Sequence, residues 1–247
     1  MNLLVWYASH QSAICGIGLG IAVLICVLHY RFFQAKACKP NADSGGLVKR
    51  FTRGENFQHW LRLILFITVA ITGSIMVMAK PVHSPIGAWH GWIGFILVII
   101  SVINLINWRR DVFFHKPDLV WLKSLGGYLA ETDKILPAGR FNAGQKVFFW
   151  LILIDIIALM ITAIYMEQLG HHTETARQIA RETMAWGLHS FLGLLGIMMV
   201  IGHAYLSLFI NPETARVMWD GYVNEQYTRQ HHPLWKYSSR RYLREGK

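Results

Sequence analysis

Residues 185–210 read AWGLHSFLGLLGIMMVIGHAYLSLFI, and this run decides the fold because it is long and apolar enough to cross a bilayer. The hydrocarbon layer is about 30 Å thick, which a helix of about 20 apolar residues spans. Four more runs of this kind lie at 12–32, 58–79, 87–107 and 146–166. In hydrocarbon the backbone must satisfy its own hydrogen bonds, so each run is predicted to be a helix. We therefore expect an all-α fold, an integral membrane helical bundle with five transmembrane helices.

The composition fits a membrane protein with a basic inner side. Of the 247 residues, 53% are hydrophobic and 15% are charged, and the formal net charge is +10. The basic residues gather at 31–57, at 109–146 and after residue 210. Since cytoplasmic loops are enriched in Lys and Arg, the N-terminus is predicted outside and the C-terminus in the cytoplasm, with the chain multi-pass in the inner (cytoplasmic) membrane. The charge is expected to meet anionic membrane lipid, and nucleic acid is not expected as a partner.

The runs and the charged segments divide the chain into four parts. These are an extra N-terminal transmembrane helix at 1–33, a basic cytoplasmic linker at 34–57, a four-helix core at 58–210 with a cytoplasmic connection at 108–145, and a basic cytoplasmic tail at 211–247. Within the connection, Asp118 to Ala130 has the pattern of an amphipathic helix on the membrane surface.

Four histidines lie inside the apolar runs, at His59, His90, His189 and His203. His189 and His203 are about four turns apart in one run, so their imidazoles face the same way about 21 Å apart. His90 begins the third run at the outer side, and His59 begins the second run at the inner side. Depth therefore pairs His90 with His189 and His59 with His203. Two imidazoles at equal depth on facing helices are the axial ligands that a haem iron needs, so two haem b groups are predicted.

The polar and small residues of the spans also fit roles that need no haem. A membrane histidine can bond a neighbouring helix in place of a metal, so the alternative is a haem-free helical anchor or transporter. Glycines such as Gly73 leave room for a macrocycle, but they also permit close helix packing. Asp155 is a carboxyl group well inside a span, where it is expected to be protonated, to have a partner on another helix, or to belong to a proton path.

Several side chains outside the pairs have simpler predicted roles. Cys15, Cys26 and Cys38 lack paired spacing, so neither a zinc site nor a covalently attached haem is predicted. Candidates for pairing with haem propionates, or alternatively solvated charges, are Arg53, Arg62, Lys80 and Arg140. Histidines predicted to be solvated in loops or tails are His10, His83, His115, His171, His172, His231 and His232.

Two short motifs make a family resemblance specific. FNAGQK at 141–146 precedes the fourth run, and HHPLW lies at 231–235 in the tail. With the four histidines, they make the chain resemble the cytochrome b (gamma) subunit of membrane-bound formate dehydrogenases over roughly residues 50–240. The first helix is a departure, because the best-known members of that family have four spans.

The resemblance implies a function and its partners. It implies the same pairing, with an inner haem on His59 and His203 and an outer haem on His90 and His189. It places menaquinone or another quinone near the inner haem, beside Asn142 and Gly144. The implied partners are an iron–sulfur (beta) subunit and a molybdenum- or tungsten-pterin (alpha) subunit, with no catalytic residue for formate in this chain.

The site residues near the fourth run have a second interpretation. Gln145 is a plausible helper at the quinone site, but Asn142 can equally be the N-cap of the fourth helix, a common role for Asn. For the whole chain, a cytochrome b subunit of a hydrogenase or of a sulfur-compound reductase is the nearest alternative.

Overall fold

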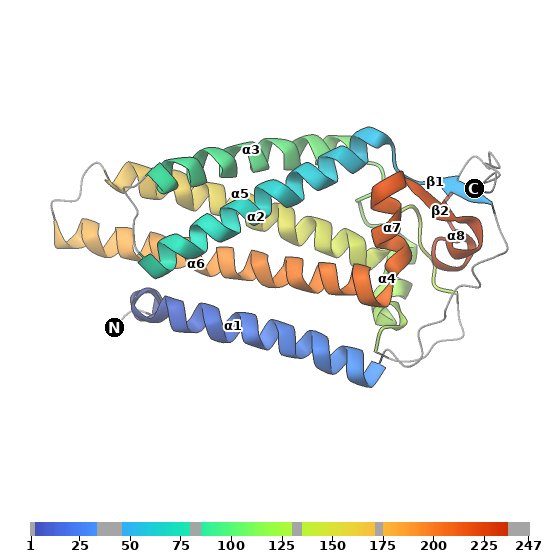
Figure 1. Cartoon of the computed structure of the whole chain (residues 1–247), viewed down its shortest axis with the longest axis horizontal. Coiled ribbons are helices and arrows are strands. Elements are labelled where there is room, and N and C mark those ends of the chain that lie inside the picture. Colours follow the sequence, from blue (N-terminus) through green and yellow to red (C-terminus); the bar gives the residue numbers. More distant parts are fainter. Residues whose placement is uncertain (1–2, 34–45, 80–84, 130–134, 171–174, 237–247) are drawn as a thin grey trace. The chain divides into compact units, whose positions relative to one another are not determined.

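The computed structural model describes residues 3–33, 46–79, 85–129, 135–170 and 175–236. Five helices in these ranges are long and apolar enough to cross a membrane, as predicted. They are α1 (Leu3–Phe33), α2 (Arg53–Ala79), α3 (Pro85–Trp108), α5 (Ala143–Gly170) and α6 (Ala176–Tyr205), the last continued by the π-helical turn η3 (Leu206–Ile210) (Figure 1). The all-α prediction is confirmed. Cys38, Lys80, His83, His171 and His172 lie outside the described residues.

Helices α2, α5 and α6 begin before the apolar runs do, because a polar capping turn precedes each run. At α2, the Thr52 N–H donates to Glu55 Oε2 at 2.7 Å, and the Glu55 N–H donates to Thr52 Oγ1 at 3.2 Å. At α6, Thr175 and Gln178 make the same exchange at 2.9 and 3.3 Å. This reciprocal pattern is a capping box, which satisfies N–H groups that have no partner within the helix.

The chain forms two compact units, and each draws on all five long helices. The first unit consists of Met1–Leu24, Leu61–Ile103 and Leu151–Gly202. In it, α1 packs along α6: Ser190 donates to Gln11 Oε1 at 3.0 Å, and a Cβ on Gly18 would lie 3.1 Å from Leu194. The helix that departs from the four-span pattern is therefore a neighbour of α6.

The second unit consists of Ile25–Trp60, Asn104–Trp150 and His203–Lys247. Its short elements are β1 (Leu47–Lys49), α4 (Lys116–Lys123), the 3₁₀ turn η2 (Leu125–Gly127), α7 (Pro212–Asp220), β2 (Tyr222–Asn224) and α8 (Glu225–His231). Strands β1 and β2 pair antiparallel, with Val48 opposite Val223. Gly221 ends α7 with a φ of 83°, and a Cβ there would collide with the carbonyl oxygen of Phe51, so glycine is required.

The amphipathic helix predicted from Asp118 to Ala130 is shorter in the structure. It ends at Lys123, because Gly126 and Gly127 adopt φ values of 66° and 74°, which a continuing right-handed helix excludes. The turn folds back so that Gly126 lies against the buried Trp121 ring, where a side chain would collide. Trp121 thereby becomes the centre of a small core.

The prediction that His232 is solvated is wrong. Its side chain is 1% exposed, and its Nδ1 bonds the carbonyl oxygen of Gly139 at 2.8 Å, so Nδ1 carries the proton. Burial, and secondarily the Arg50 guanidinium, hold the pKa of His232 well below the ordinary 6.5. His232 is therefore a neutral structural group that attaches the tail to the segment before α5.

Candidate functional site

The first histidine pair joins α3 and α6 in the first unit. The ring centroids of His90 and His189 are 6.1 Å apart, with an interplanar angle of 69°. Behind His90, a Cβ on Gly73 of α2 would lie 3.2 Å from the ring atom Cε1. Gly73 thus allows α2 to approach the imidazole closely, as the sequence suggested for small residues.

Each imidazole of this pair is held by a threonine hydroxyl. Thr72 Oγ1 lies 2.8 Å from His90 Nδ1, and Thr162 Oγ1 lies 2.8 Å from His189 Nδ1. Both hydroxyls donate their hydrogen to carbonyl oxygens of the preceding helical turn. With these hydrogens on the backbone carbonyls, each hydroxyl is assigned as the acceptor from Nδ1–H, and this tautomer leaves Nε2 as the basic nitrogen on both rings. Orientation of this kind is typical of metal-ligating histidines.

The second histidine pair joins α2 and α6 in the second unit. The centroids of His59 and His203 are 6.5 Å apart, with an interplanar angle of 58°. Phe148 of α5 stacks on His203, with centroids 4.3 Å apart and ring planes 8° apart. Trp60, next to His59, donates from Nε1 to the Met218 carbonyl oxygen at 2.9 Å, which joins α2 to α7. The structure therefore brings together both pairs that depth predicted.

The geometry of both pairs fits an iron between the rings. A metal–imidazole bond of about 2.0 Å, with about 1.2 Å from the nitrogen to the ring centroid, separates two coaxial centroids by about 6.4 Å. The observed 6.1 and 6.5 Å lie on either side of this value. Among the described residues no group of three or more His, Cys, Asp or Glu could hold a metal ion alone. Two-imidazole sites suit an iron whose remaining four ligands come from a porphyrin.

The residues predicted for the quinone form the start of α5. Asn142 Oδ1 accepts from the Gln145 N–H at 2.9 Å, and Gln145 Oε1 accepts from the Asn142 N–H at 3.1 Å. This is a capping box, so Asn142 is the N-cap of α5 through its side-chain oxygen. Its amide nitrogen takes no part in the cap. Gly144 packs on Trp121: a Cβ there would lie 2.5 Å from Cη2 of the ring.

Two arginines hold the segment before α5. Arg140 bonds Glu55 at 2.6 Å, Asp111 at 2.9 Å and the carbonyl oxygen of Arg50 at 2.7 Å. Arg50 in return donates to the Arg140 carbonyl oxygen at 2.6 Å and to Gln145 Oε1 at 3.2 Å. Burial lowers the pKa of Arg50 to about 10, so it stays protonated at neutral pH. Arg140, which the sequence made a candidate for a propionate, is thus engaged in this network.

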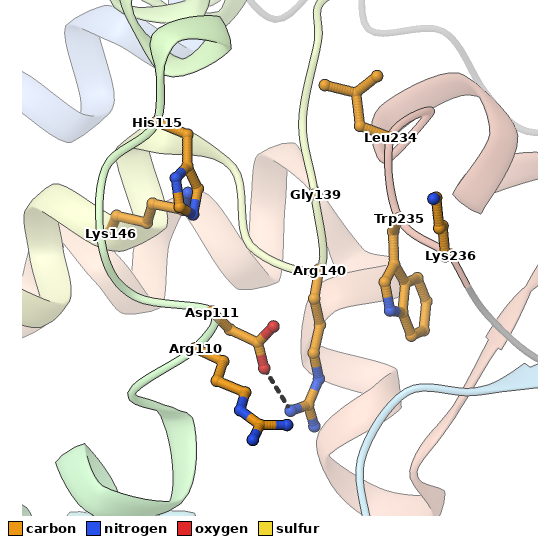
Figure 2. A pocket seen from close by; sticks show the side chains of 9 residues that line it. All are labelled: Arg110, Asp111, His115, Gly139, Arg140, Lys146, Leu234, Trp235 and Lys236. Carbon is orange, nitrogen blue, oxygen red and sulfur yellow. Dashed lines mark hydrogen bonds and ion pairs between the residues drawn. The ribbon is translucent and has the colours of Figure 1, made fainter.

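A basic pocket of about 260 Å³ lies beside the same segment (Figure 2). Figure 2 shows Asp111 and Arg140 meeting across it, joined by their ion pair. Its lining also includes His115 and Lys146, and Lys146 Nζ pairs with Asp118 at 2.8 Å. Both partners of that pair have side chains that are 4% exposed. Six of the nine residues that line the pocket have ionisable side chains.

Comparison with known proteins supplies the family. The family model described as prokaryotic cytochrome b561 matches residues 50–221, a range that holds all four paired histidines and leaves α1 out. This chain belongs to the prokaryotic cytochrome b561 family. A chain of that family with five candidate membrane helices is a multi-pass membrane cytochrome, and the family implies haem b. The two imidazole pairs are the residues of this chain that fit the ligation of haem b iron.

Individual relatives confirm the resemblance found from the sequence. The formate dehydrogenase cytochrome b556(fdo) subunit of Escherichia coli strain K12 is 24% identical over 198 residues, which are 76% of this chain and 91% of that protein. The nitrate-inducible cytochrome b556(Fdn) subunit of the same strain is 23% identical over 186 residues, 72% of this chain and 84% of that one. The formate dehydrogenase cytochrome b556 subunit of Haemophilus influenzae is 24% identical over 122 residues, about half of each chain.

Sequence reasoning missed three residues beside the imidazoles, namely Thr72, Thr162 and Phe148. A spacing signal for two of them exists. Phe148 and Thr162 lie 14 residues apart on α5, the same spacing as His189 and His203 on α6. Two antiparallel helices with matched 14-residue spacings can meet at two levels on one face of each.

Proposed function

We propose that this chain is the dihaem b-type cytochrome subunit that anchors a formate dehydrogenase complex in the membrane and passes electrons to menaquinone or another quinone. The observation that carries the proposal is that α6 presents two imidazoles, each facing a second imidazole at a separation suited to one iron. The identity of the complex is inferred from the relatives, because the three reported above are named as formate dehydrogenase subunits.

The four histidines hold the irons, and the threonines prepare one of the two sites. When bound, the two haems supply carriers that accept and return one electron each. His90 and His189 would ligate one iron, and His59 and His203 the other. Because Thr72 and Thr162 orient the first pair in advance, that site loses little conformational entropy on binding.

Arg62 is the best candidate for a haem propionate. It follows His59 by three residues on α2, and its Nε is buried without a hydrogen-bond partner among the described residues. A buried guanidinium nitrogen without an acceptor is costly, and a propionate oxygen would satisfy it with a charge-assisted bond.

The start of α5 is the proposed quinone site. Phe148, which stacks on His203, follows Asn142 by six residues, about 9 Å along the helix. A quinone at Asn142 would thus lie near the His59–His203 iron. The Asn142 amide nitrogen and the first-turn N–H of Gly144 are donors suited to a quinone carbonyl, while the oxygens of Asn142 and Gln145 hold the turn in shape.

Quinone reduction also needs two protons for two electrons. The basic pocket lies at the N-terminal end of α5, where the quinone is proposed to bind. It includes Lys146 of the first turn and the ionisable His115 and Asp111. With the basic segments on the cytoplasmic side, the pocket would deliver protons from the cytoplasm. Electrons would enter at the outer face from an iron–sulfur subunit, itself supplied by a molybdenum- or tungsten-pterin subunit that oxidises formate.

A reduced-minus-oxidised absorption spectrum of the purified complex tests the haem assignment. We expect b-type bands and two haems per chain. His203→Ala should remove one haem and His90→Ala the other, while His10→Ala should keep both, since among the described residues the exposed His10 ring bonds partners within α1. A colourless protein would support the haem-free anchor instead. A co-purifying hydrogenase or sulfur-compound reductase would overturn the formate assignment while leaving the cytochrome intact.

Asn142→Asp separates the quinone role of Asn142 from its capping role. Aspartate is as good an N-cap as asparagine, but its carboxylate cannot donate to a carbonyl. We expect normal haem content with slow oxidation of the reduced haems by a menaquinone analogue. Asn142→Ser, which also caps, is the matched control for loss of the amide alone. Wild-type oxidation rates in both variants would show that Asn142 only caps α5.

A further inference from the structure

Asp155 is a buried carboxyl group to which the proposed function gives no role. It lies in α5 within the first unit, is 4% exposed, and has no hydrogen-bond partner for either oxygen among the described residues. Buried polar groups are normally hydrogen-bonded, because desolvating an ionised carboxylate without a partner is expensive. Such a group inside a membrane helix is expected to have a function.

The neighbours of Asp155 place it on the ligand-bearing face of α6. A Cβ built on Gly196 would lie 2.6 Å from Asp155 Oδ2 and 3.6 Å from the ring of Phe66 on α2. Gly196 is therefore the residue of α6 that leaves space for the carboxyl group. It follows His189 by seven residues and precedes His203 by seven, so it shares their face of the helix, about 10 Å along the axis from each.

Helix α5 repeats the same spacing in the opposite direction. Seven residues before Asp155, Phe148 stacks on His203. Seven residues after it, Thr162 bonds His189. The antiparallel helices α5 and α6 thus meet at three successive levels, and the carboxyl group occupies the level between the two imidazoles of α6.

Few other charged groups face this level. Between His189 and His203, α6 has no ionisable side chain, and α2 has none from Leu63 to Ala79. On the neighbouring helices, the ionisable side chains that come nearest to this level in the sequence are those of Arg62 on α2, His90 on α3 and Cys15 on α1. None of them bonds Asp155. In the assembled cytochrome the charges beside this level would be those of the haem irons and of Arg62, which lies one turn of α2 from Phe66.

We propose that Asp155 takes up one proton when a neighbouring haem iron gains one electron from an iron–sulfur cluster of a partner subunit, and releases it when the iron is reoxidised. This rests on the proposed function. A ferric iron within a doubly deprotonated porphyrin carries one net positive charge, which stabilises the aspartate anion at low dielectric. Reduction to ferrous iron removes that charge, and the carboxylate is then neutralised by a proton on Oδ2. Each electron that the iron gains is therefore accompanied by one proton on Asp155.

Redox titration of the haem bands at several pH values tests the proposal. In the wild-type complex, the midpoint potential of at least one haem should fall as pH rises, with at most one proton per electron. Asp155→Asn cannot ionise, so it should hold the acid-limit potential at every pH. Glu167→Gln, which removes a carboxyl group near the far end of α5, is the matched control and should keep the wild-type dependence.

Infrared difference spectra of the wild-type complex give a test that needs no variant to fold. In the wild-type complex, reduction should produce the carbonyl stretching band of a protonated carboxyl group, which shifts in D₂O. Where Asp155→Asn assembles, its spectrum should lack this band. The proposal is overturned if no such band forms, or if the Asp155→Asn potentials keep the wild-type pH dependence. A protein with no haem bands would instead overturn the proposed function, whereas two haems with pH-independent potentials would overturn this inference alone.

Discussion

Replacing Thr162 by valine should raise the potential of one haem and leave the other unchanged. The Thr162 hydroxyl accepts a hydrogen bond from His189 Nδ1 at 2.8 Å. That bond increases electron density on the imidazole, which favours the ferric iron over the ferrous iron. Valine has nearly the same shape and cannot accept the bond, so the ferric form loses stabilisation.

The size of the shift follows from the strength of the bond. A hydrogen bond of this kind contributes about 1 kcal/mol net, and a tenfold change in a one-electron equilibrium, about 1.4 kcal/mol, corresponds to about 59 mV. The upper limit for Thr162→Val is therefore about 40 mV. Thr72 makes the equivalent bond to His90, so the double variant should approach about 80 mV if the two effects add.

Potentiometric titration of the haem absorption bands measures this shift. The matched control is Thr68→Val on α2, because the Thr68 hydroxyl also donates to the preceding turn but lies on an exposed side. The affected haem should be the one that survives in His203→Ala. Unchanged potentials in the double variant, or a shift confined to the haem that His203 ligates, would refute the assigned tautomers and pairing.

Three further predictions concern the surroundings of the site. Gly73→Val places a side chain against His90 Cε1, so the haem of that pair should be lost and the spectrum reduced to one haem. Arg140→Met leaves the partly buried Glu55 without its cation, which should cost about 3 kcal/mol and lower the unfolding temperature, with partial recovery in the double variant that also carries Glu55→Gln. For His232 the pKa is depressed by burial, so the unfolded chain binds the proton first and stability falls as pH drops below 6.5. Hydrogen exchange should therefore show the segment around His232 opening more readily as pH falls below 6.5 in the wild type but not in His232→Gln.

The sequence predicts the membrane helices and the histidine pairs for the same reason. Both depend on regular geometry that hydrocarbon enforces: a fixed length for each span and a fixed rotation per residue. The alternating direction of successive spans then places His59 and His203, and likewise His90 and His189, at matching depths. Five apolar runs and one spacing along α6 were sufficient to choose partners that the structure brings within 6.5 Å.

The beginnings of the helices were harder to predict, because they depend on side chains outside the apolar runs. Capping residues such as Thr175 and Gln178 are polar, so a window that measures apolarity stops short of them. The pattern of Ser, Thr or Asn followed three residues later by Glu or Gln occurs at Thr52, Asn142 and Thr175. It would have corrected the starts of α2 and α6, as the N-cap interpretation of Asn142 does for α5. His232 was missed for a different reason, since a histidine in a polar tail gives no local sign that the tail folds back.

The face of α6 that contacts α1 explains why an added helix is compatible with the histidine pairs. At about 100° per residue, Gly196 and His203 lie within about 40° of His189 around the axis. Ser190 and Leu194, which contact α1 in the first unit, lie about 100° and 140° away, and Tyr205, which bonds His29 of α1 in the second unit, lies about 160° away. The family match begins at residue 50, after α1 has ended. Because α1 contacts sides of α6 that face away from the imidazoles, its presence is compatible with all four ligand positions.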